Sequence, residues 1–153
     1  MIEVIWKLIH NSYPIGDRIK YFAPIECPSC NYNWQDRNHF ILECSSSKWL
    51  WSFIKNKTSL FPNFKSWSEC FLKVFNEDKF KESVLPATVL TLIIYELHCS
   101  HIKSTYEDFN PTSSYIINSF KHWFNLQTQV IQNLNLNKKV KARFRKLDNI
   151  FNS

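Results

Sequence analysis

Three cysteines and one histidine lie close together in the first third of the sequence, at a spacing typical of a metal site. Cys27 and Cys30 form a C-x2-C pair, and His39 and Cys44 follow as an H-x4-C pair. A C-x2-C pair can turn both sulfurs toward one point, and Pro28 favours the necessary turn. Three thiolates and an imidazole make a soft, four-coordinate shell, which predicts one bound Zn2+ ion.

Four protein ligands would leave no coordination position for a metal-activated water, so we expect a structural role for the ion. The sequence lacks the zinc deaminase signature, an H-E-x-x-H helix, a G-x-S-x-G elbow and a Walker loop. We therefore expect no enzymatic activity. The two other cysteines, Cys70 and Cys99, follow helical apolar patterns and are expected to be inert core thiols.

A second group of residues is cationic. The net charge of the chain is +6, and six cations but a single acid lie between residues 138 and 153. Such a run can neutralise phosphates, and an aromatic between metal ligands can stack on an unpaired base. The candidate nucleic-acid contacts are Trp34, Arg37, Lys138, Lys139, Lys141, Arg143, Arg145 and Lys146. The other interpretations are that the charge run is a solvated helix face and that Trp34 packs the metal loop.

The composition favours a mostly α-helical fold, because aromatic residues make up 16% of the chain and there is one glycine. We predict a multi-helix single domain over residues 1–153, with a small Cys3His zinc knuckle inserted near the N-terminus. Its parts are a zinc-binding module (24–54), a helical body (55–137) and a basic C-terminal segment (138–153). Apolar spacing and capping residues predict helices from Ile2 to about His10, from Pro14, after Ser45–Ser47, from Ser66, from Ala87 to about Thr105, from Ser113 or Ser114, and over the last segment.

Residues 5 to 54 resemble a known family. Trp6 and His10 match a W-x3-H motif, residues 13–19 match an L-P-x-G-x-R-I motif with Tyr13 in the leucine position, and Leu50-Trp51 matches a hydrophobic-Trp pair after the last ligand. With the four metal ligands, this pattern resembles the zinc-binding domain that follows the reverse transcriptase of non-LTR retrotransposons. The resemblance implies binding of template RNA or target DNA, with a reverse transcriptase polypeptide as a partner.

Two alternatives stay open from the sequence. One is a zinc-stabilised protein-interaction module that uses Trp49, Trp51 and Trp67 as its contact surface. The other is an orphan or degenerate retroelement fragment without activity. An odd number of cysteines suits a reducing compartment, and we find no secretory signal or uninterrupted membrane span. We expect an intracellular protein, cytoplasmic or nuclear, with no membrane partner.

Overall fold

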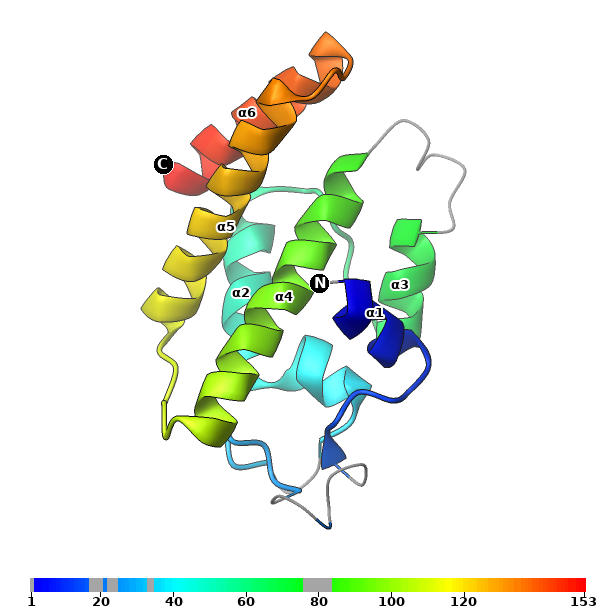
Figure 1. Cartoon of the computed structure of the whole chain (residues 1–153), viewed down its shortest axis with the longest axis vertical. Coiled ribbons are helices and arrows are strands. Elements are labelled where there is room, and N and C mark those ends of the chain that lie inside the picture. The colour runs from blue at the N-terminus through cyan, green and yellow to red at the C-terminus, as the bar shows by residue number, and fades with distance from the viewer. Residues whose placement is uncertain (1, 17–20, 22–24, 33–34, 76–83) are drawn as a thin grey trace.

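A computed structural model describes residues 2–16, 21, 25–32, 35–75 and 84–153, and the elements in these ranges are all helical (Figure 1). The mostly α-helical, multi-helix fold predicted from composition is thereby confirmed, with the Cys3His group near the N-terminus. In chain order the elements are α1 (Ile2–Ile9), the π-helical turn η2 (His39–Glu43), α2 (Ser45–Lys57), α3 (Trp67–Phe75), α4 (Val84–Tyr106), α5 (Ser113–Asn133) and α6 (Lys138–Asn152).

Helix α4 is the central element of the fold. It contacts α1 and α3 on one side and α2 and α5 on the other (Figure 1). Its apolar residues point in several directions, and Leu90, Ile93 and Ile94 are fully buried. By length and composition α4 could also cross a membrane, a property that central helices of globular folds share. Here it carries a buried carboxyl, Glu96, into the helix packing.

Helices α5 and α6 form an antiparallel pair held by an aromatic cluster. The rings of Phe120 and Phe124 in α5 contact that of Phe151 in α6, with centroids 5.4 and 5.0 Å apart, and Phe144 stacks on Phe124 at 6.0 Å. The predicted apolar stripe of the last segment is therefore docked on the body. One residue predicted to lie inside α5, Val130, is 52% exposed.

The starts of α3 and α5 carry side-chain caps, whereas α2 begins after Cys44 with no side-chain cap from the predicted serines and α4 begins at Val84, before the predicted Ala87. In α3, the Glu69 amide donates to Ser66 Oγ at 3.2 Å, and the Glu69 carboxylate accepts from the Lys65 amide at 2.6 Å. In α5, the Tyr115 amide donates to Thr112 Oγ1 at 3.2 Å. Of the helix predicted from Pro14, the first two residues are not helical and Gly16 is in a 3-10 turn, while the expected inner residues, Ile19 and Phe22, lie outside the described residues.

Candidate metal centre

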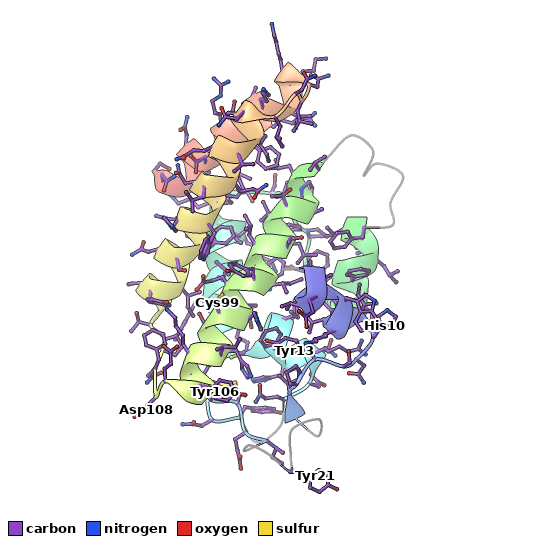
Figure 2. All side chains as sticks on the ribbon, viewed as in Figure 1. His10, Tyr13, Tyr21, Cys99, Tyr106 and Asp108 are labelled. Carbon is purple, nitrogen blue, oxygen red and sulfur yellow. The ribbon has the colours of Figure 1, made fainter. Side chains whose placement is uncertain are left out.

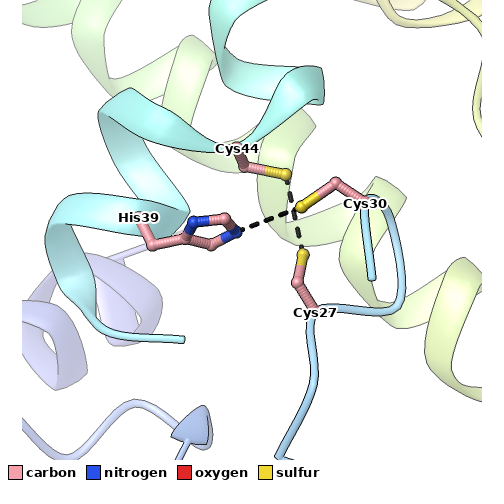
Figure 3. Close-up of side chains that lie close together, drawn as sticks. All are labelled: Cys27, Cys30, His39 and Cys44. Carbon is pink, nitrogen blue, oxygen red and sulfur yellow. Dashed lines mark hydrogen bonds between the residues drawn. The ribbon is translucent and has the colours of Figure 1, made fainter. Parts of the chain in front are cut away.

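The four predicted ligands converge on one point (Figure 3). Their donor atoms all lie within 4.8 Å of one another. Cys27 Sγ is 3.6 Å from Cys44 Sγ, and Cys30 Sγ is 3.4 Å from His39 Nε2. We refer to these four residues as the Cys3His cluster. Three of them are buried, and Cys30 is partly exposed.

The spacing of the donor atoms fits a tetrahedral metal ion. Metal–sulfur bonds of about 2.3 Å and metal–nitrogen bonds of about 2.0 Å place tetrahedral ligand atoms roughly 3.5–3.8 Å apart. The separations within the Cys27–Cys44 and Cys30–His39 pairs, 3.6 and 3.4 Å, lie close to that range. The Cys3His cluster could therefore hold a metal ion once its wider separations, up to 4.8 Å, contract around it.

Cys27 and Cys30 are brought together by a tight turn. The Cys27 carbonyl accepts from the Cys30 amide at 3.3 Å and from the Asn31 amide at 2.8 Å, and the Cys27 amide donates to the Tyr32 carbonyl at 2.9 Å. Asn31 closes the turn with φ of +54°, a left-handed conformation that asparagine adopts more readily than most residues. Tyr32 then stacks on the imidazole of His39, with ring centroids 4.8 Å apart.

His39 and Cys44 are brought together by the π-helical turn. In an α-helix, residues five apart point about 140° away from each other. The wider turn of η2, closed by a Cys44 amide donating to the His39 carbonyl at 2.7 Å, lets both side chains face the other cysteines. Asp36 Oδ1 accepts from the His39 amide at 2.7 Å and fixes the start of the turn.

Four side-chain hydrogen bonds tie this turn to the helices around it. Trp51 Nε1 of α2 donates to the Ile41 carbonyl at 2.7 Å, and Asn38 Oδ1 accepts from the Trp67 amide of α3 at 2.8 Å. Arg37 Nη1 donates to the last carbonyls of α1. The metal centre is thus part of the helical packing, and Trp51 gives a physical reason for the Leu-Trp pair after the last ligand.

The segment before the first cysteine is anchored beside the same turn. Tyr13 lies between α1 and α4 (Figure 2), where its hydroxyl hydrogen-bonds His98 Nδ1 at 2.5 Å and its ring packs on Phe40 of η2. Burial raises the pKa of Tyr13 above its usual value, so the hydroxyl stays protonated at neutral pH. Tyr13 therefore links this segment to the central helix.

The local environment separates the acidities of the two paired thiols. The hydrogen bond between Cys27 and Cys44 lowers the pKa of Cys44 well below its usual range, helped by His39 and by the Ser46 amide at the start of α2. The same hydrogen bond, together with burial, raises the pKa of Cys27. The two sulfurs therefore share a proton in the absence of a cation, and a bound cation would favour both thiolates.

The remaining sulfur and imidazole groups lie outside the cluster, as predicted. Cys70 is fully buried and its pKa is raised to about 12 by burial, while Cys99 is half-buried. His101 packs on Phe40 and burial lowers its pKa to about 4, so its ring is neutral at pH 7. The metal group found among the described residues contains the four predicted ligands and no other.

Some of the predicted nucleic-acid residues form hydrogen bonds within the fold, and some are exposed on α6. Lys141 Nζ donates to the Gln132 carbonyl at the C-terminus of α5 at 2.7 Å, and Arg145 Nε donates to Gln132 Oε1 at 2.9 Å. Arg37 caps α1, and Trp34 lies outside the described residues. The exposed members on α6 are Lys138, Lys139, Arg143, Lys146 and also Arg145, whose bond to Gln132 lies at the surface.

The tryptophan surface expected for a protein-interaction module is not there. Trp51 and Trp67 are 5% and 3% exposed, and Trp49 is partly buried against the core. The expectation was wrong because apolar spacing on a short helix does not tell which neighbour will cover it. Trp6 of α1 is instead the exposed tryptophan among the described residues, at 55%.

Several residues that shape the site carry weak sequence signals. Asn31 and Asp36 hold the two turns, and an Asn after C-x2-C or an Asp three residues before a ligand His could have indicated them. Trp51 as a donor to Ile41 has no local signal, since the contact joins two elements.

Comparisons with protein-family models, curated proteins and solved structures found no match. The features of this chain that bear on function are therefore the Cys3His cluster and the surfaces around it.

Proposed function

We propose that the ion held by the Cys3His cluster is Zn2+ and that its role is structural. The donor set supports this proposal, because three sulfurs and one imidazole at tetrahedral spacing suit zinc. Four protein donors fill a tetrahedral shell, so this chain's own residues would provide folding energy and no open position for catalysis. On this basis the chain has no catalytic activity of its own.

We further propose that the chain binds nucleic acid through α6. The observation that carries this proposal is a cationic face on that helix, formed by Lys139, Arg143 and Lys146 at i, i+4 and i+7, with Lys138 at the start. The single acid of the helix, Asp148, accepts from Asn125 and Asn152 instead. Cations repeated along one side of a helix suit a phosphate backbone.

The cationic face continues onto α2. Ser153 follows Lys146 by seven residues and so lies on the same side of the chain, and Lys57 Nζ donates to Ser153 Oγ at 3.4 Å. Lys57 belongs to the C-terminal turn of α2, close to the metal module in the chain. The proposed interface therefore joins the basic C-terminal segment to the helix that follows the last ligand.

The resemblance to the reverse transcriptase zinc-binding domain also supports nucleic-acid binding. The residues that carry it, Gly16 and the Leu50-Trp51 pair, contact or cover the metal module. In this proposal the chain is an accessory of a retroelement reverse transcriptase, in which catalysis is performed by the polymerase polypeptide.

The test is a fluorescence-anisotropy titration of the zinc-loaded chain with labelled RNA and DNA at several salt concentrations. We expect binding that weakens steeply with salt, and a Lys139→Gln/Lys146→Gln variant whose log–log salt slope is reduced by about 1.4 for single strands. The matched control, Lys7→Gln/Lys73→Gln, removes the same charge from two exposed i,i+4 ion pairs on α1 and α3. Equal losses in both variants, or no binding at low salt, would contradict the proposal.

The second candidate is a zinc-stabilised protein-interaction module. It is favoured by the exposed Trp6 and Ile9 of α1, which are 55% and 41% accessible. Zinc binding without nucleic-acid affinity, together with capture of a reverse transcriptase polypeptide that is lost in Trp6→Ala, would select this candidate. Loss of all binding in a well-folded, zinc-loaded chain would point to a degenerate fragment.

A further inference from the structure

A groove runs along the outer face of α2, on the side away from the core. Its volume is about 360 Å³. Helix α2 contributes Lys48, Ser52, Lys55 and Asn56 to its lining. A second, more open hollow of about 490 Å³ shares Lys55 and Asn56 with the first and continues along the loop after the helix. We call the two hollows together the α2 groove.

The α2 groove is cationic and contains no acid. Lys48 and Lys55 line its first part, and Lys57 lines its second part. Lys48 and Lys55 are seven residues apart, which places them about 10 Å apart along the same side of the helix. Lys55 Nζ donates to Asn63 Oδ1 at 2.8 Å, which holds it over the groove. Such an arrangement suits a ligand with more than one phosphate.

Aromatic and polar groups lie between these lysines. The half-buried ring of Phe64 forms one wall, packed edge-on against Trp51 with centroids 5.8 Å apart. Ser52 and Asn56, both exposed, add a hydroxyl and an amide to the residues that line the groove. A flat ring beside donors and acceptors, flanked by cations, suits a nucleobase joined to phosphates.

We propose that the α2 groove binds an unpaired nucleotide of a single strand, with its base against Phe64 and its flanking phosphates at Lys48 and Lys55. This inference rests on the proposed nucleic-acid function and makes it more specific. A duplex would bury its bases and present only its backbone. The aromatic wall can stack only on an unpaired base. The chain therefore prefers single strands, and α6 provides additional phosphate contacts.

One end of the α2 groove is fixed by the metal centre. Leu42, which lines it, lies in η2 between His39 and Cys44, and Lys48 belongs to the first turn of α2 after Cys44. Metal binding therefore positions this end, and removal of the metal weakens single-strand binding more than it weakens the charge-driven contact of α6.

The experiment compares a fluorescein-labelled 12-nucleotide RNA with the same RNA in a duplex, using full-length, zinc-loaded chain. We expect the single strand to bind more tightly, and both Lys48→Gln/Lys55→Gln and Ser52→Glu to weaken it by roughly tenfold while affecting the duplex less. Photo-crosslinking with 4-thiouridine in that RNA should label tryptic peptides 49–55 or 58–65. The matched control is Lys7→Gln/Lys73→Gln, which removes two charges remote from the groove.

Three outcomes would overturn the inference while leaving the proposed function intact. They are equal affinity for strand and duplex, crosslinks confined to residues 138–153, and groove variants that bind like the control. Displacement of the RNA from α2 by polyglutamate at equal charge concentration would also overturn it, because an acidic peptide would then be the preferred ligand. No binding of wild-type chain to any nucleic acid would remove the proposed function itself.

Discussion

Gly16 packs its backbone directly against the carbonyl oxygen of Gln35. The φ angle of Gly16 is +54°, and a Cβ built on it would overlap with that oxygen far inside van der Waals contact. Gln35 is buried and its side-chain amide donates to the Glu26 carbonyl at 2.9 Å. The single glycine of the chain thus stands where neither the backbone angle nor the available space admits a side chain, next to the segment that joins the two ligand pairs.

Gly16→Ala is expected to lower the free energy of unfolding by about 2–4 kcal/mol, because the left-handed angle and the clash with Gln35 both oppose the methyl group. Urea denaturation of the zinc-loaded chain measures this loss, and the rate of metal release to a chelator should rise. The control is Asn11→Gly, at another left-handed residue with φ of +51°, where glycine adopts the same angle without strain and the change should stay within about 0.5 kcal/mol. An alanine variant as stable as wild type would contradict the described geometry.

The Cys3His cluster makes a spectroscopic prediction. Titration with Co2+ should give one equivalent of binding with the intense visible bands of a tetrahedral site and thiolate charge-transfer absorption, both displaced by Zn2+. Cys27→Ser removes a ligand and should weaken metal binding by more than the roughly 10–100-fold cost of an outer-shell change. Cys99→Ala removes a thiol outside the cluster and should titrate like wild type. Identical titrations of the two variants would rule out the assigned ligand set.

The sequence predicts well what depends on local spacing. The four ligands follow from C-x2-C and H-x4-C, because short turns bring such pairs together whatever surrounds them. The apolar stripe formed by Phe144, Leu147 and Phe151 predicts α6 and its buried side. Its helical spacing marks the face that packs on a core, whatever residues form that core.

Other features could not be predicted because they depend on contacts between distant segments. The π-helical turn is a wider form of a helix that local propensity does not distinguish, and it is held by Asp36 and by Trp51 from the next helix. Val130 and Ile131 are adjacent apolar residues of α5, and only the packing of the body decides that Ile131 is buried while Val130 is exposed. The α2 groove likewise arises only when Phe64 folds back beside the helix.

Arg37 gives a prediction that separates a structural from a binding role. Its Nη1 atom lies 3.1 Å from the Leu8 carbonyl and 3.3 Å from the Ile9 carbonyl, where it donates to the last acceptors of α1. Arg37→Ala should therefore lower the free energy of unfolding by about 1–2 kcal/mol. Anisotropy titrations of the folded variant should keep the wild-type salt slope.

Lys146→Gln provides the reciprocal control for Arg37. It is exposed on the cationic face of α6, so its replacement should leave stability within about 0.5 kcal/mol of wild type and reduce the salt slope. A reduced salt slope in Arg37→Ala would instead assign that residue to the nucleic-acid interface.

Glu96 gives a prediction for the pH dependence of stability. Its carboxyl group is buried among helices α4 and α5, where it accepts from Ser100 Oγ at 3.0 Å and from Ser119 Oγ. Burial raises its pKa above the ordinary value of 4.5, although the serine hydroxyls and Trp123 oppose the shift. A group with a raised pKa in the folded state stabilises the fold fully below pH 4.5, and this stabilisation is lost as the pH rises through the folded-state pKa.

Glu96→Gln keeps the shape of the side chain and removes its ionisation. The free energy of unfolding of the variant minus that of wild type should therefore increase from pH 4.5 upward and level off above the folded-state pKa. Urea denaturation at a series of pH values measures this difference, and protonation of the metal ligands at low pH affects both chains alike. Glu69→Gln is the control of opposite sign, because the hydrogen bond with Lys73 lowers the pKa of that exposed carboxyl. The loss of stability in Glu69→Gln should be small, present above pH 4.5 and absent in acid. A stability difference for Glu96→Gln that does not change with pH would show that the Glu96 carboxyl is not buried as described.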